Sequence, residues 1–588
     1  MLSLLNKRWI LRSPAPDKVD DFARSLNISP VAARLLVNRK VETVDEARVF
    51  MESALSSLHD PFLITGMELA VERILKAIEN KESIRLFCDY DVDGVTSAAF
   101  LTHFFRDIDV KVRYYLPERM KEGYGINESA VRAIREEGDT LMITADCGIT
   151  AVNEVELARS IGLDVIITDH HQVGGEGLPN AVAVLNPHRS DCDYPYRFLS
   201  GVGLAFKLAT AVRNALHNKA GWSKDRLPNM KRHLDLVALG TIADVAPLTG
   251  ENHVLARHGL EVLTTTDKAG LVALKAAANV DNQVNARSVG FALGPRLNAA
   301  GRLGKADSGF HLLTSEDLKE AKELARGLDG INQERKKIQE QVQEEAEYLI
   351  GREVDLEEDL VIVLASENFH SGVVGIVASR IVEKYFRPVV LIALENGTGK
   401  GSGRSIPRFN LHRAFTDCTS HLLQFGGHAY AAGLTIDEGS VDSFRNAMNE
   451  VGRRILSEDD LVSEILLDTP LKISEINQEL QNQISRMEPF GAENRPPVFL
   501  IQKVGVSGLK TMGREETHVR FQAKQEGAGI DAVGFNLAEQ FASINAGDEV
   551  DLACEFQIND WNGRKKLELK ILDLRRACPE LAEGAIRF

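Results

Sequence analysis

The sequence predicts an α/β protein with two α/β lobes, a long helical connector between them, and a small β-barrel at the C-terminal end. Three observations predict this class. Short apolar runs alternate with helix-like stretches from about residue 80 to 245, and the pattern returns from about 351 to 456. A charged helical segment separates these two regions, and strand-like sequence dominates beyond residue 457. Such alternation is typical of a mostly parallel sheet covered by helices.

Length and charge limit the possible classes of protein. At 588 residues the chain is too long for a single ordinary core, and a prior of roughly 150 residues per domain suggests about three to four domains. The 69 basic and 85 acidic residues give a net charge of −16. The overall charge therefore does not indicate a nucleic-acid partner. It does not exclude one, because the electrostatic potential in one groove can differ from the average and bound cations would offset acidic clusters.

Cysteine usage and the N-terminus indicate the compartment. The six cysteines include no C-x-x-C pair, which argues against a disulfide framework or a zinc ribbon and favours a reducing environment. No apolar run has the length of a signal peptide or approaches the ~18 uncharged residues that span a bilayer. We therefore expect a soluble, intracellular protein, located in the cytoplasm.

Five apolar runs predict the strands of the first lobe. They cover residues 83–88, 110–116, 140–145, 164–168 and 181–185. Helix-like stretches such as 96–105 and 128–137 separate them. In sheets of this kind ligands bind beyond the carboxyl ends of the strands, so the residues that follow each run are the informative ones.

Three aspartates follow the first run, in the stretch "DYDVDG": Asp89, Asp91 and Asp93. The spacing fits the start of an EF-hand calcium loop, but the twelfth position, which should be Glu, is Phe100. That interpretation fails. A solvated acidic turn is the plain alternative, yet the cluster comes directly after a buried-looking strand, where carboxylates are costly without a cation.

Other polar residues occupy equivalent junctions: Asp146, His170 and Asp244. A parallel sheet could bring all of them to one rim. An oxygen-rich set with one or two histidines suits Mn²⁺ or Mg²⁺ better than zinc. Two such ions about 3.5 to 4 Å apart can activate water and stabilise a phosphoryl centre, so hydrolysis of a phosphate ester or anhydride is the leading reaction class. Taken singly, each Asp could instead cap a helix, and one of two adjacent histidines could simply be packed.

The remaining elements follow from local signals. "TSED" at 314–317 fits a capping box and predicts a helix to about Ile350, loosened at Gly327 and Gly330. Strands "LVIVLA" and "PVVLIAL" flank a helix over 371–385, and the glycine-dense "GTGKGSGRS" and "FGGHAYAAG" depart from regular structure. Alternating apolar residues on both sides of Asn562-Gly563 predict a hairpin of the small barrel.

Four motifs, "DYDVDG", "ADCGI", "TDHH" and "GTIADVAPL", occur in an order that resembles the DHH phosphoesterase superfamily. Further strings, among them "LSGVGLAFKL", "GPRLNAAGRL", "FHSGVVGIVASR" and "FGGHAYAAG", resemble the RecJ family of single-strand-specific 5′-to-3′ exonucleases over nearly the whole chain. The resemblance implies five parts. They are an N-terminal helical segment (1–50), a DHH catalytic domain (51–250), a connecting region with the long helix (251–350), a DHHA1 domain (351–456) and an OB-fold domain (457–588).

The resemblance also implies roles for the polar residues at the rim. Asp91 would hold one of two Mn²⁺ or Mg²⁺ ions, Asp93, His170 and Asp244 would hold the other, and Asp146 would lie between both.

Three more residues complete the implied catalytic set. Asp89 would be an additional ligand or would orient one. His171 would face the scissile phosphate and donate to its oxygens or to the leaving group. Asp169 would orient its neighbours, with a helix cap as the equal alternative.

Contacts to DNA are implied as well. Ser402 and Arg404 would hold the 5′-terminal phosphate together with Arg119, and His428 would contact a phosphate or brace the metal rim. Three residues of "GPRLNAAGR" would contact the strand as it enters, or else stabilise the lobe junction: Arg296, Asn298 and Arg302.

Two other groups of residues are candidates with a plain alternative. Arg408 and Arg413 share with Arg404 a stretch free of acidic residues, but they could form an ordinary solvated helix start. In the barrel, Phe521 and Phe535 are better explained by burial, whereas Trp561 in the hairpin turn should be exposed and could stack on bases.

The implied function is processive removal of 5′-mononucleotides from single-stranded DNA in recombination and repair. A single-strand-binding protein and a RecQ-type helicase are implied partners, and a monomer is expected. One alternative is a DHH hydrolase of pyrophosphate, cyclic dinucleotides or short oligonucleotides, which the added barrel disfavours. The other is a catalytically silent scaffold, which should have lost several metal ligands, whereas this chain retains all five.

Overall fold

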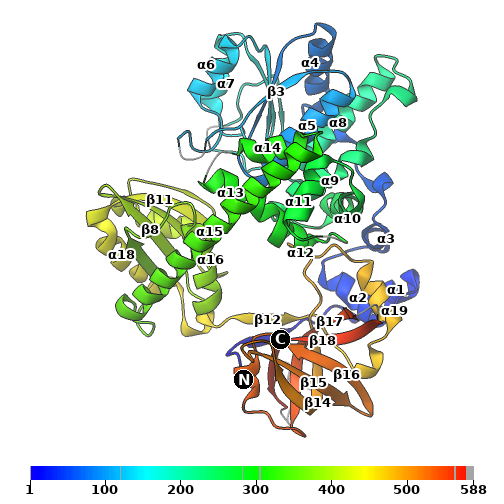
Figure 1. Cartoon of the computed structure of the whole chain (residues 1–588), viewed down its shortest axis with the longest axis vertical. Coiled ribbons are helices and arrows are strands. Elements are labelled where there is room, and N and C mark those ends of the chain that lie inside the picture. The colour runs from blue at the N-terminus through cyan, green and yellow to red at the C-terminus, as the bar shows by residue number, and fades with distance from the viewer. Residues whose placement is uncertain are drawn as a thin grey trace. The chain divides into compact units, whose positions relative to one another are not determined.

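The chain forms two compact units in a computed structural model (Figure 1). One unit comprises Arg48–Arg335 with Met487–Arg495, and we call it the first unit. The second unit comprises Met1–Ala47, Lys336–Arg486 and Pro496–Phe588. The structure describes residues 2–118, 121–175, 177–280, 283–303, 306–561 and 564–577, without the side chains of 560, 561, 564 and 565.

A five-stranded parallel sheet forms the centre of the first unit, in the order β3-β2-β4-β5-β6. Its strands are β2 (Ile84–Cys88), β3 (Val112–Tyr115), β4 (Leu141–Ala145), β5 (Asp164–Thr168) and β6 (Ala183–Leu185). The five predicted strands are thus confirmed. Because Cys88 of β2 pairs with Ala145 of β4, the residues that follow these two strands emerge side by side. β5 lies next to β4, so its end reaches the same edge of the sheet.

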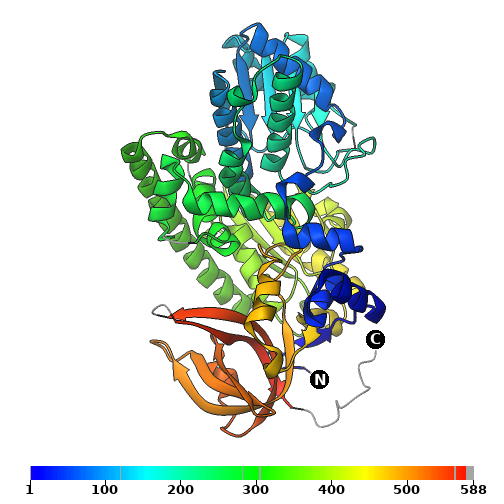
Figure 2. The ribbon, with the colours of Figure 1, turned by 90° about the vertical axis from the view of Figure 1, so that its right-hand side faces the viewer.

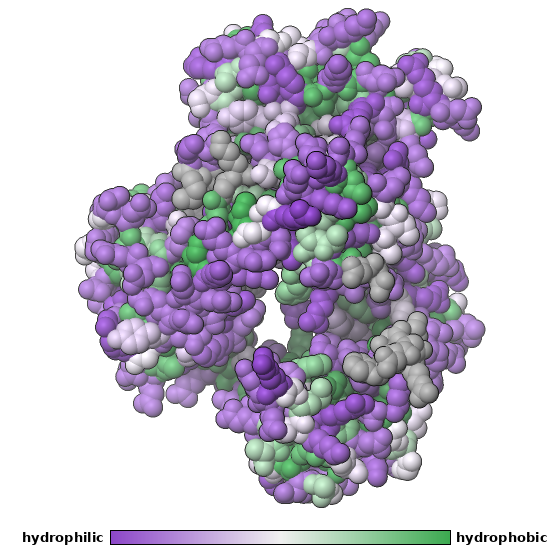
Figure 3. Space-filling model, viewed as in Figure 1, coloured by the Kyte–Doolittle hydropathy of each residue, from purple (hydrophilic) through white to green (hydrophobic). Residues whose placement is uncertain are grey.

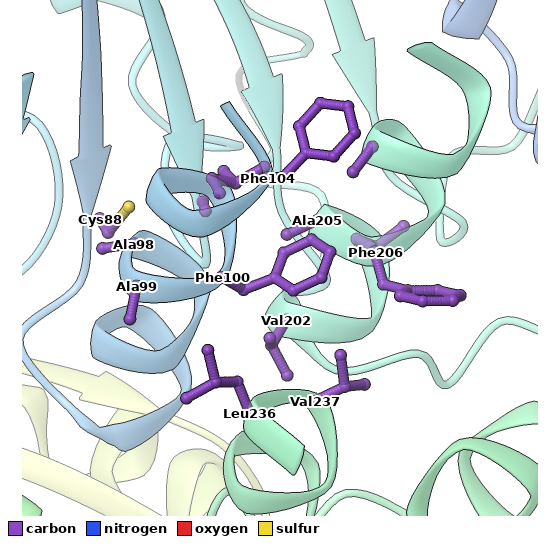
Figure 4. Packing of buried hydrophobic residues seen from close by; sticks show 14 of the residues in the cluster. Cys88, Ala98, Ala99, Phe100, Phe104, Val202, Ala205, Phe206, Leu236 and Val237 are labelled. Carbon is purple, nitrogen blue, oxygen red and sulfur yellow. The ribbon is translucent and has the colours of Figure 1, made fainter. Parts of the chain in front are cut away.

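Helices cover this sheet and hold its edge in place. The helices of the first unit are α4 (Met67–Glu79), α5 (Val92–Asp107), α6 (Glu128–Glu136), α7 (Val152–Ser160), α8 (Gly201–Asn218), α9 (Leu234–Ala243), α10 (Gly250–Thr265), α11 (Ala269–Ala277), α12 (Ala286–Ser288), α13 (Gly294–Leu303) and α14 (Asp307–Thr314). α3 (Val44–Glu52) begins in the second unit and ends in the first. Figure 4 shows Phe100 of α5 pointing toward Ala205 and Phe206 of α8, with Leu236 and Val237 of α9 below them. Phe100 is completely buried, so α5, α8 and α9 share one apolar core.

The connector is one continuous helix, α15 (Leu318–Glu353), which passes from the first unit into the second (Figure 1). The predicted capping box at 314–317 is wrong, because Thr314 is the last residue of α14. The carboxylate of Asp317 caps α15 instead, accepting hydrogen bonds from the backbone N–H groups of Lys319 and Glu320. The helix continues through Gly327 and Gly330 without a break.

The second α/β lobe contains a five-stranded mixed sheet in the order β10-β11-β9-β8-β7. Its strands are β7 (Ile362–Ser366), β8 (Val389–Glu395), β9 (Thr398–Arg404), β10 (Gln424–Gly427) and β11 (Ala431–Asp437). Its helices are α16 (Val374–Tyr385), α17 (Leu411–Asp417) and α18 (Val441–Ile455). β7 and β8 run parallel, and the other pairs are antiparallel.

Two stretches predicted to be irregular are strands of this sheet. β9 and the pair β10–β11 fall on the glycine-dense sequences. Gly401 and Gly403 face the core, where a Cβ on them would lie 2.8 Å from Leu434 and 2.5 Å from Leu411. The glycines make room for bulky neighbours, so the strand forms although its own residues have low strand propensity.

The C-terminal strands close into the predicted small barrel, drawn in orange and red in Figure 2. They are β14 (Phe499–Met512), β15 (His518–Gln525), β16 (Ala528–Gly534), β17 (Glu549–Trp561) and β18 (Arg564–Arg576), with α20 (Ala538–Phe541) between β16 and β17. β14 pairs with both β15 and β17, which closes the ring, and β17–β18 is the predicted hairpin. Phe521 is buried, as expected, whereas Phe535 is 48% exposed; the side chain of Trp561 lies outside the described residues.

The N-terminal segment packs within the second unit. It contains β1 (Arg8–Leu11), α1 (Pro16–Leu26) and α2 (Pro30–Asn38). β1 pairs in parallel with β12 (Glu464–Leu467), which leads into the barrel past β13 (Thr469–Pro470) and α19 (Gln478–Ser485). The indole N–H of Trp9 donates to the buried carboxylate of Asp573, at 2.9 Å. This contact ties the start of the chain to the barrel.

Most of the surface in Figure 3 is hydrophilic, with scattered apolar residues. Among the described residues we find no helix long and apolar enough to cross a bilayer. Five cysteines lie in the described part of the chain, and all five are buried free thiols.

We predict that Phe100→Ala destabilises the first unit by about 3 to 5 kcal/mol, because it removes a buried aromatic ring and leaves a cavity between α5 and α8. Leu69→Ala on the exposed face of α4, where the side chain is 56% exposed, should change stability by at most about 0.5 kcal/mol. Urea unfolding followed by circular dichroism measures both. Equal midpoints for the two variants would contradict the packing described above.

Candidate metal centre and phosphate pocket

The carboxyl edge of the β3-β2-β4-β5-β6 sheet gathers the acidic and histidine side chains predicted from the sequence. Three groups of residues could each hold a metal ion, because within each group the potential ligand atoms lie within 4.8 Å of one another. They are Asp89, Asp91 and Asp146; Asp93, His170 and Asp244; and Asp146, His170 and His171. The residues expected to share a rim therefore share it.

Helix N-termini position the first carboxylates. Asp91 is the N-cap of α5, where one side-chain oxygen accepts hydrogen bonds from the backbone N–H groups of Asp93 and Gly94. Asp93 is fully buried and accepts from the backbone N–H groups of Gly201, at 2.6 Å, and Val202, at 2.9 Å. Both N–H groups belong to the first turn of α8, where the helix dipole favours a negative charge. These two backbone donors were not predicted, because they depend on α8 meeting α5 in space.

Asp146 reaches the centre from a left-handed turn. Asp146 directly follows β4 and has a φ of 64°, and its backbone N–H donates to the carbonyl oxygen of Thr168. This uncommon backbone conformation turns the side chain over the edge of the sheet. Oδ1 of Asp146 then lies 2.9 Å from Nε2 of His170.

The two facing atoms converge without bonding to each other. Oδ1 of Asp146 and Nε2 of His170 are both buried, and neither has a hydrogen-bond partner in the described part of the chain. Buried polar atoms without partners are rare and call for an explanation such as an ion. A carboxylate oxygen and a neutral imidazole nitrogen aimed at one point are suitable ligands for a divalent cation.

Charge repulsion within the cluster is strong. Burial raises the pKa of Asp93 to about 7, with the Asp91 carboxylate adding to the shift. Burial and the Asp93, Asp91 and Asp89 charges raise the pKa of Asp244 to about 9. Burial and the charges of the neighbouring aspartates also raise the pKa of Asp146. The carboxylates are thus costly to ionise together unless positive charge is supplied, which is the electrostatic signature of a cation site.

The two adjacent histidines respond to burial in opposite ways. Burial, and then the charge of His171, lowers the pKa of His170 to about 4, so its ring is neutral and can serve as a ligand. Burial also opposes protonation of His171, but the hydrogen bond from its Nδ1 to Asp169 Oδ1, at 2.7 Å, and the negative charges of Asp169, Asp89 and Asp91 together outweigh burial and raise the pKa of His171. The sequence pair thus contains one candidate ligand and one candidate proton donor.

Asp169 orients His171 and the neighbouring turn. One oxygen accepts from the ring and the backbone N–H of His171, and the other accepts from the backbone N–H of Ile149. Tyr124 is a neighbour that was not predicted: its hydroxyl donates to the carbonyl oxygen of Asp146 and lies 3.1 Å from His171 Nδ1. The glycines on both sides of Tyr124 in "EGYGI" were the available signal.

A second polar site lies in the second unit, on β9. Nη1 of Arg404 donates to Ser402 Oγ, at 3.1 Å, and to the carbonyl oxygen of Gly403. Within the described residues this guanidinium forms no ion pair with a carboxylate, and burial lowers its pKa. A Cβ on Gly375, in the first turn of α16, would lie 2.9 Å from Ser402 Oγ and 3.0 Å from Arg404 Nη2. The pocket therefore combines a partly buried cation with a close backbone, an arrangement that suits a phosphate.

The other predicted DNA contacts are placed as follows. The Arg296 guanidinium pairs with Asp329, at 2.9 Å, and donates to the carbonyl oxygens of Ala292 and Ala277. Asn298 Oδ1 accepts from the backbone N–H of Val92, so this side chain braces the start of α5.

Three predicted contacts remain. Arg302 is half-buried in the last turn of α13. His428 is exposed between β10 and β11, and Arg119 lies outside the described residues.

Comparison with known families places the same three parts along the chain. The N-terminal domain of the DHH family matches residues 83–241, the DHHA1 domain matches 358–453, and the RecJ OB domain matches 467–573.

Curated relatives match over most of the chain. The single-stranded-DNA-specific exonuclease RecJ of Bacillus subtilis is 40% identical over 569 residues, covering 96% of this chain and 70% of the relative. The Escherichia coli protein of the same name is 36% identical, covering 95% and 98%.

Solved structures agree with this similarity. RecJ of Thermus thermophilus in complex with Mn²⁺ aligns with a TM-score of 0.83 and 29% identity, covering 99% of this chain and 81% of that one. The Mg²⁺ complex of the same protein aligns with a TM-score of 0.77 and 28% identity, covering 99% and 80%.

We predict that Gly201→Ala weakens Mn²⁺ binding by roughly 10- to 100-fold. A Cβ at this position would lie 2.6 Å from Asp146 Cβ, so α8 or Asp146 must shift and the donors to Asp93 shift with it. Gly327→Ala in α15 is the matched control, since its Cβ would meet nothing within 4 Å. Isothermal titration with Mn²⁺ compares the two, and unchanged affinity in Gly201→Ala would contradict this geometry.

Proposed function

The chain belongs to the RecJ family of single-stranded-DNA-specific exonucleases, and from that membership we propose that it removes nucleotides from the 5′ end of single-stranded DNA by metal-dependent phosphodiester hydrolysis. The observation that carries the proposal is the cluster of carboxylates and histidine at the edge of the first-unit sheet, with facing buried atoms that lack hydrogen-bond partners among the described residues. We propose a cytoplasmic location for this activity.

We propose that Asp93, His170 and Asp244 hold one ion and that Asp91 holds the other, with Asp146 contacting both. The grouping of ligand atoms supports this division. Two bound Mn²⁺ or Mg²⁺ ions would supply the positive charge that activates water and stabilises the phosphoryl group under attack.

Asp89 stands beside Asp91 and Asp146 and either ligates or orients these side chains. His171 would act on the substrate directly. Asp169 fixes its ring through Nδ1 and favours its protonated form, which leaves Nε2 to donate to a phosphate oxygen or to the departing 3′-oxygen.

Polarity would come from the Ser402 and Arg404 pocket. A terminal phosphate carries more negative charge than an internal phosphodiester, and a guanidinium without a carboxylate partner among the described residues can bind it through two hydrogen bonds. We propose that this pocket, with Arg119, recognises the 5′ end, and that Arg302 and His428 contact the strand.

Arg296 and Asn298 have other roles in this proposal, because their side chains are engaged within the first unit. They would position the α5 start and α13 and would not bind DNA themselves.

The C-terminal barrel would hold the strand through exposed aromatic and basic side chains, with Phe535 as a described candidate for base stacking. We propose that the chain has the five domains and segments predicted from the sequence, with catalysis in 51–250 and strand binding in 457–588. A monomer that works beside a single-strand-binding protein and a RecQ-type helicase completes the proposal; the family resemblance supports these partners.

We predict that Asp146→Ala lowers the cleavage rate by at least about 100-fold, because it removes the carboxylate placed between both ion positions. The assay uses 5′-labelled single-stranded DNA, the matched duplex and pyrophosphate, each with Mn²⁺. Mononucleotides released only from the single strand, and not by the variant, are the expected result. Equal hydrolysis of pyrophosphate would favour a small-substrate hydrolase, and no hydrolysis at all would favour a silent scaffold.

We predict that Arg404→Ala weakens binding of a 5′-phosphorylated oligonucleotide by about 2 to 3 kcal/mol, which is roughly 30- to 150-fold. The same oligonucleotide with a 5′-hydroxyl should bind native protein and variant almost equally. Fluorescence anisotropy on an Asp146→Ala background measures binding without cleavage. Equal losses for the two ends would show that Arg404 does not read the terminal phosphate.

A further inference from the structure

A groove in the second unit, separate from the Ser402 and Arg404 pocket, is lined by arginine. Its cavity of about 690 Å³ lies between the start of α17 and the end of α18. The lining residues are Arg408, Asn410, Arg413, Asp417, Arg454 and Ile455. We call it the arginine groove.

The arginine groove carries excess positive charge in an acidic protein. Three guanidinium groups face one carboxylate, that of Asp417, and this carboxylate pairs with Arg454. Arg408 pairs with Asp460 at 3.4 Å, but the Arg408 side chain is 77% exposed, and ion pairs at such sites contribute little. Arg413 forms no ion pair within the described part of the chain.

The polar groups of the groove suit phosphate. Asn410 uses its side-chain oxygen to accept from the backbone N–H of Arg413, which leaves its amide NH₂ group as a donor. Arginine forks bind phosphate oxygens through two parallel hydrogen bonds. The volume exceeds what one phosphate occupies, so a segment of chain that carries more than one phosphate fits it.

The surroundings favour a nucleic-acid strand over an acidic peptide. Ile455 is the one aliphatic side chain in the described lining, so the groove lacks the apolar pockets that anchor peptide side chains. Tyr430, which is 58% exposed, lies near the chain that leads into the groove, because the backbone N–H of Ser405, three residues before Arg408, donates to the carbonyl oxygen of Tyr430. Exposed aromatic rings near cationic side chains are typical of proteins that bind single strands.

The position along the chain supports the same partner. Arg408 is four residues after Arg404, in a segment without acidic residues. Arg408 also pairs with Asp460, in the short segment that leads from α18 to β12 and the barrel. A strand held by both the α/β lobe and the barrel of the second unit would need contacts along this segment.

We propose that the arginine groove binds internal phosphates of the single-stranded DNA substrate, with Arg408 and Arg413 as the principal contacts. The proposal rests on the proposed function, which supplies the single strand. It adds a binding site whose role is to hold the strand beyond its terminal phosphate. Binding here is independent of sequence, because it reads the backbone alone.

The test compares Arg408→Ala/Arg413→Ala with Arg352→Ala/Arg380→Ala, which removes two exposed arginines of the same unit outside the groove. Binding of 5′-phosphorylated oligothymidylates of increasing length is measured by anisotropy over a range of salt concentrations, on an Asp146→Ala background. For single strands each lost phosphate contact lowers the slope of log K against log salt by about 0.7. We expect the groove variant to lose about 1.4 from the slope for long strands and the control variant to keep it.

Five further measurements decide the outcome. The shortest oligonucleotides should bind both variants equally, and the preference for a 5′-phosphate should persist in both. Arg408→Lys/Arg413→Lys should restore most of the slope, since it keeps the charge, and thermal unfolding at the native midpoint shows that the alanine variant is folded. An unchanged salt slope of the alanine variant for long strands overturns the proposal. Binding of polyglutamate is measured for the same variant: if it loses polyglutamate binding but keeps DNA binding, the groove binds an acidic peptide and the proposal is overturned. Failure of the native protein to bind or cleave single strands would instead overturn the proposed function.

Discussion

The burial of the Asp93 carboxylate against the N-terminus of α8 is the interaction on which the rest of the first unit depends. A fully buried carboxylate is tolerated because two backbone N–H groups, those of Gly201 and Val202, donate to it. The same contact fixes the angle at which α8 meets α5, and Phe100 and Phe206 then fill the core behind it. Packing and the metal centre are therefore coupled: the apolar core holds α5 and α8 in place, and the N-terminus of α8 holds the Asp93 carboxylate.

The centre separates ligand and acid roles by environment. His170 and His171 are adjacent in sequence, yet burial keeps one ring neutral, while the hydrogen bond to Asp169 favours protonation of the other. Asp91 shows that one aspartate can be both a helix cap and a candidate metal ligand, because it caps α5 and also contributes to the ligand cluster. A carboxylate has two oxygens, so one can accept from the backbone while the other faces an ion.

The second unit uses arginine differently in two places. Arg404 is partly buried on a strand whose glycines let α16 and the sheet approach, which suits one tightly held phosphate. In the groove, Arg408 is exposed and only weakly paired, and Arg413 has no ion-pair partner among the described residues, which suits contacts that form and break as a strand moves. An acidic protein can thus bind a polyanion, because both sites keep local carboxylates few or already paired.

The sequence by itself determined the five parallel strands of the first lobe, the hairpin and barrel, the family, and which residues should meet at the sheet edge, because strand periodicity and motif order are local signals. It could not find the backbone donors at Gly201 and Val202, the Tyr124 hydroxyl, or the internal partners of Arg296 and Asn298, since these depend on contacts between segments far apart in the chain. The glycine-dense β9 was wrongly predicted for the same reason: its strand is stabilised by neighbours such as Leu411 and Leu434 and not by its own residues. Tertiary structure decided these features because burial and hydrogen bonding across distant segments set them, and local sequence does not encode either.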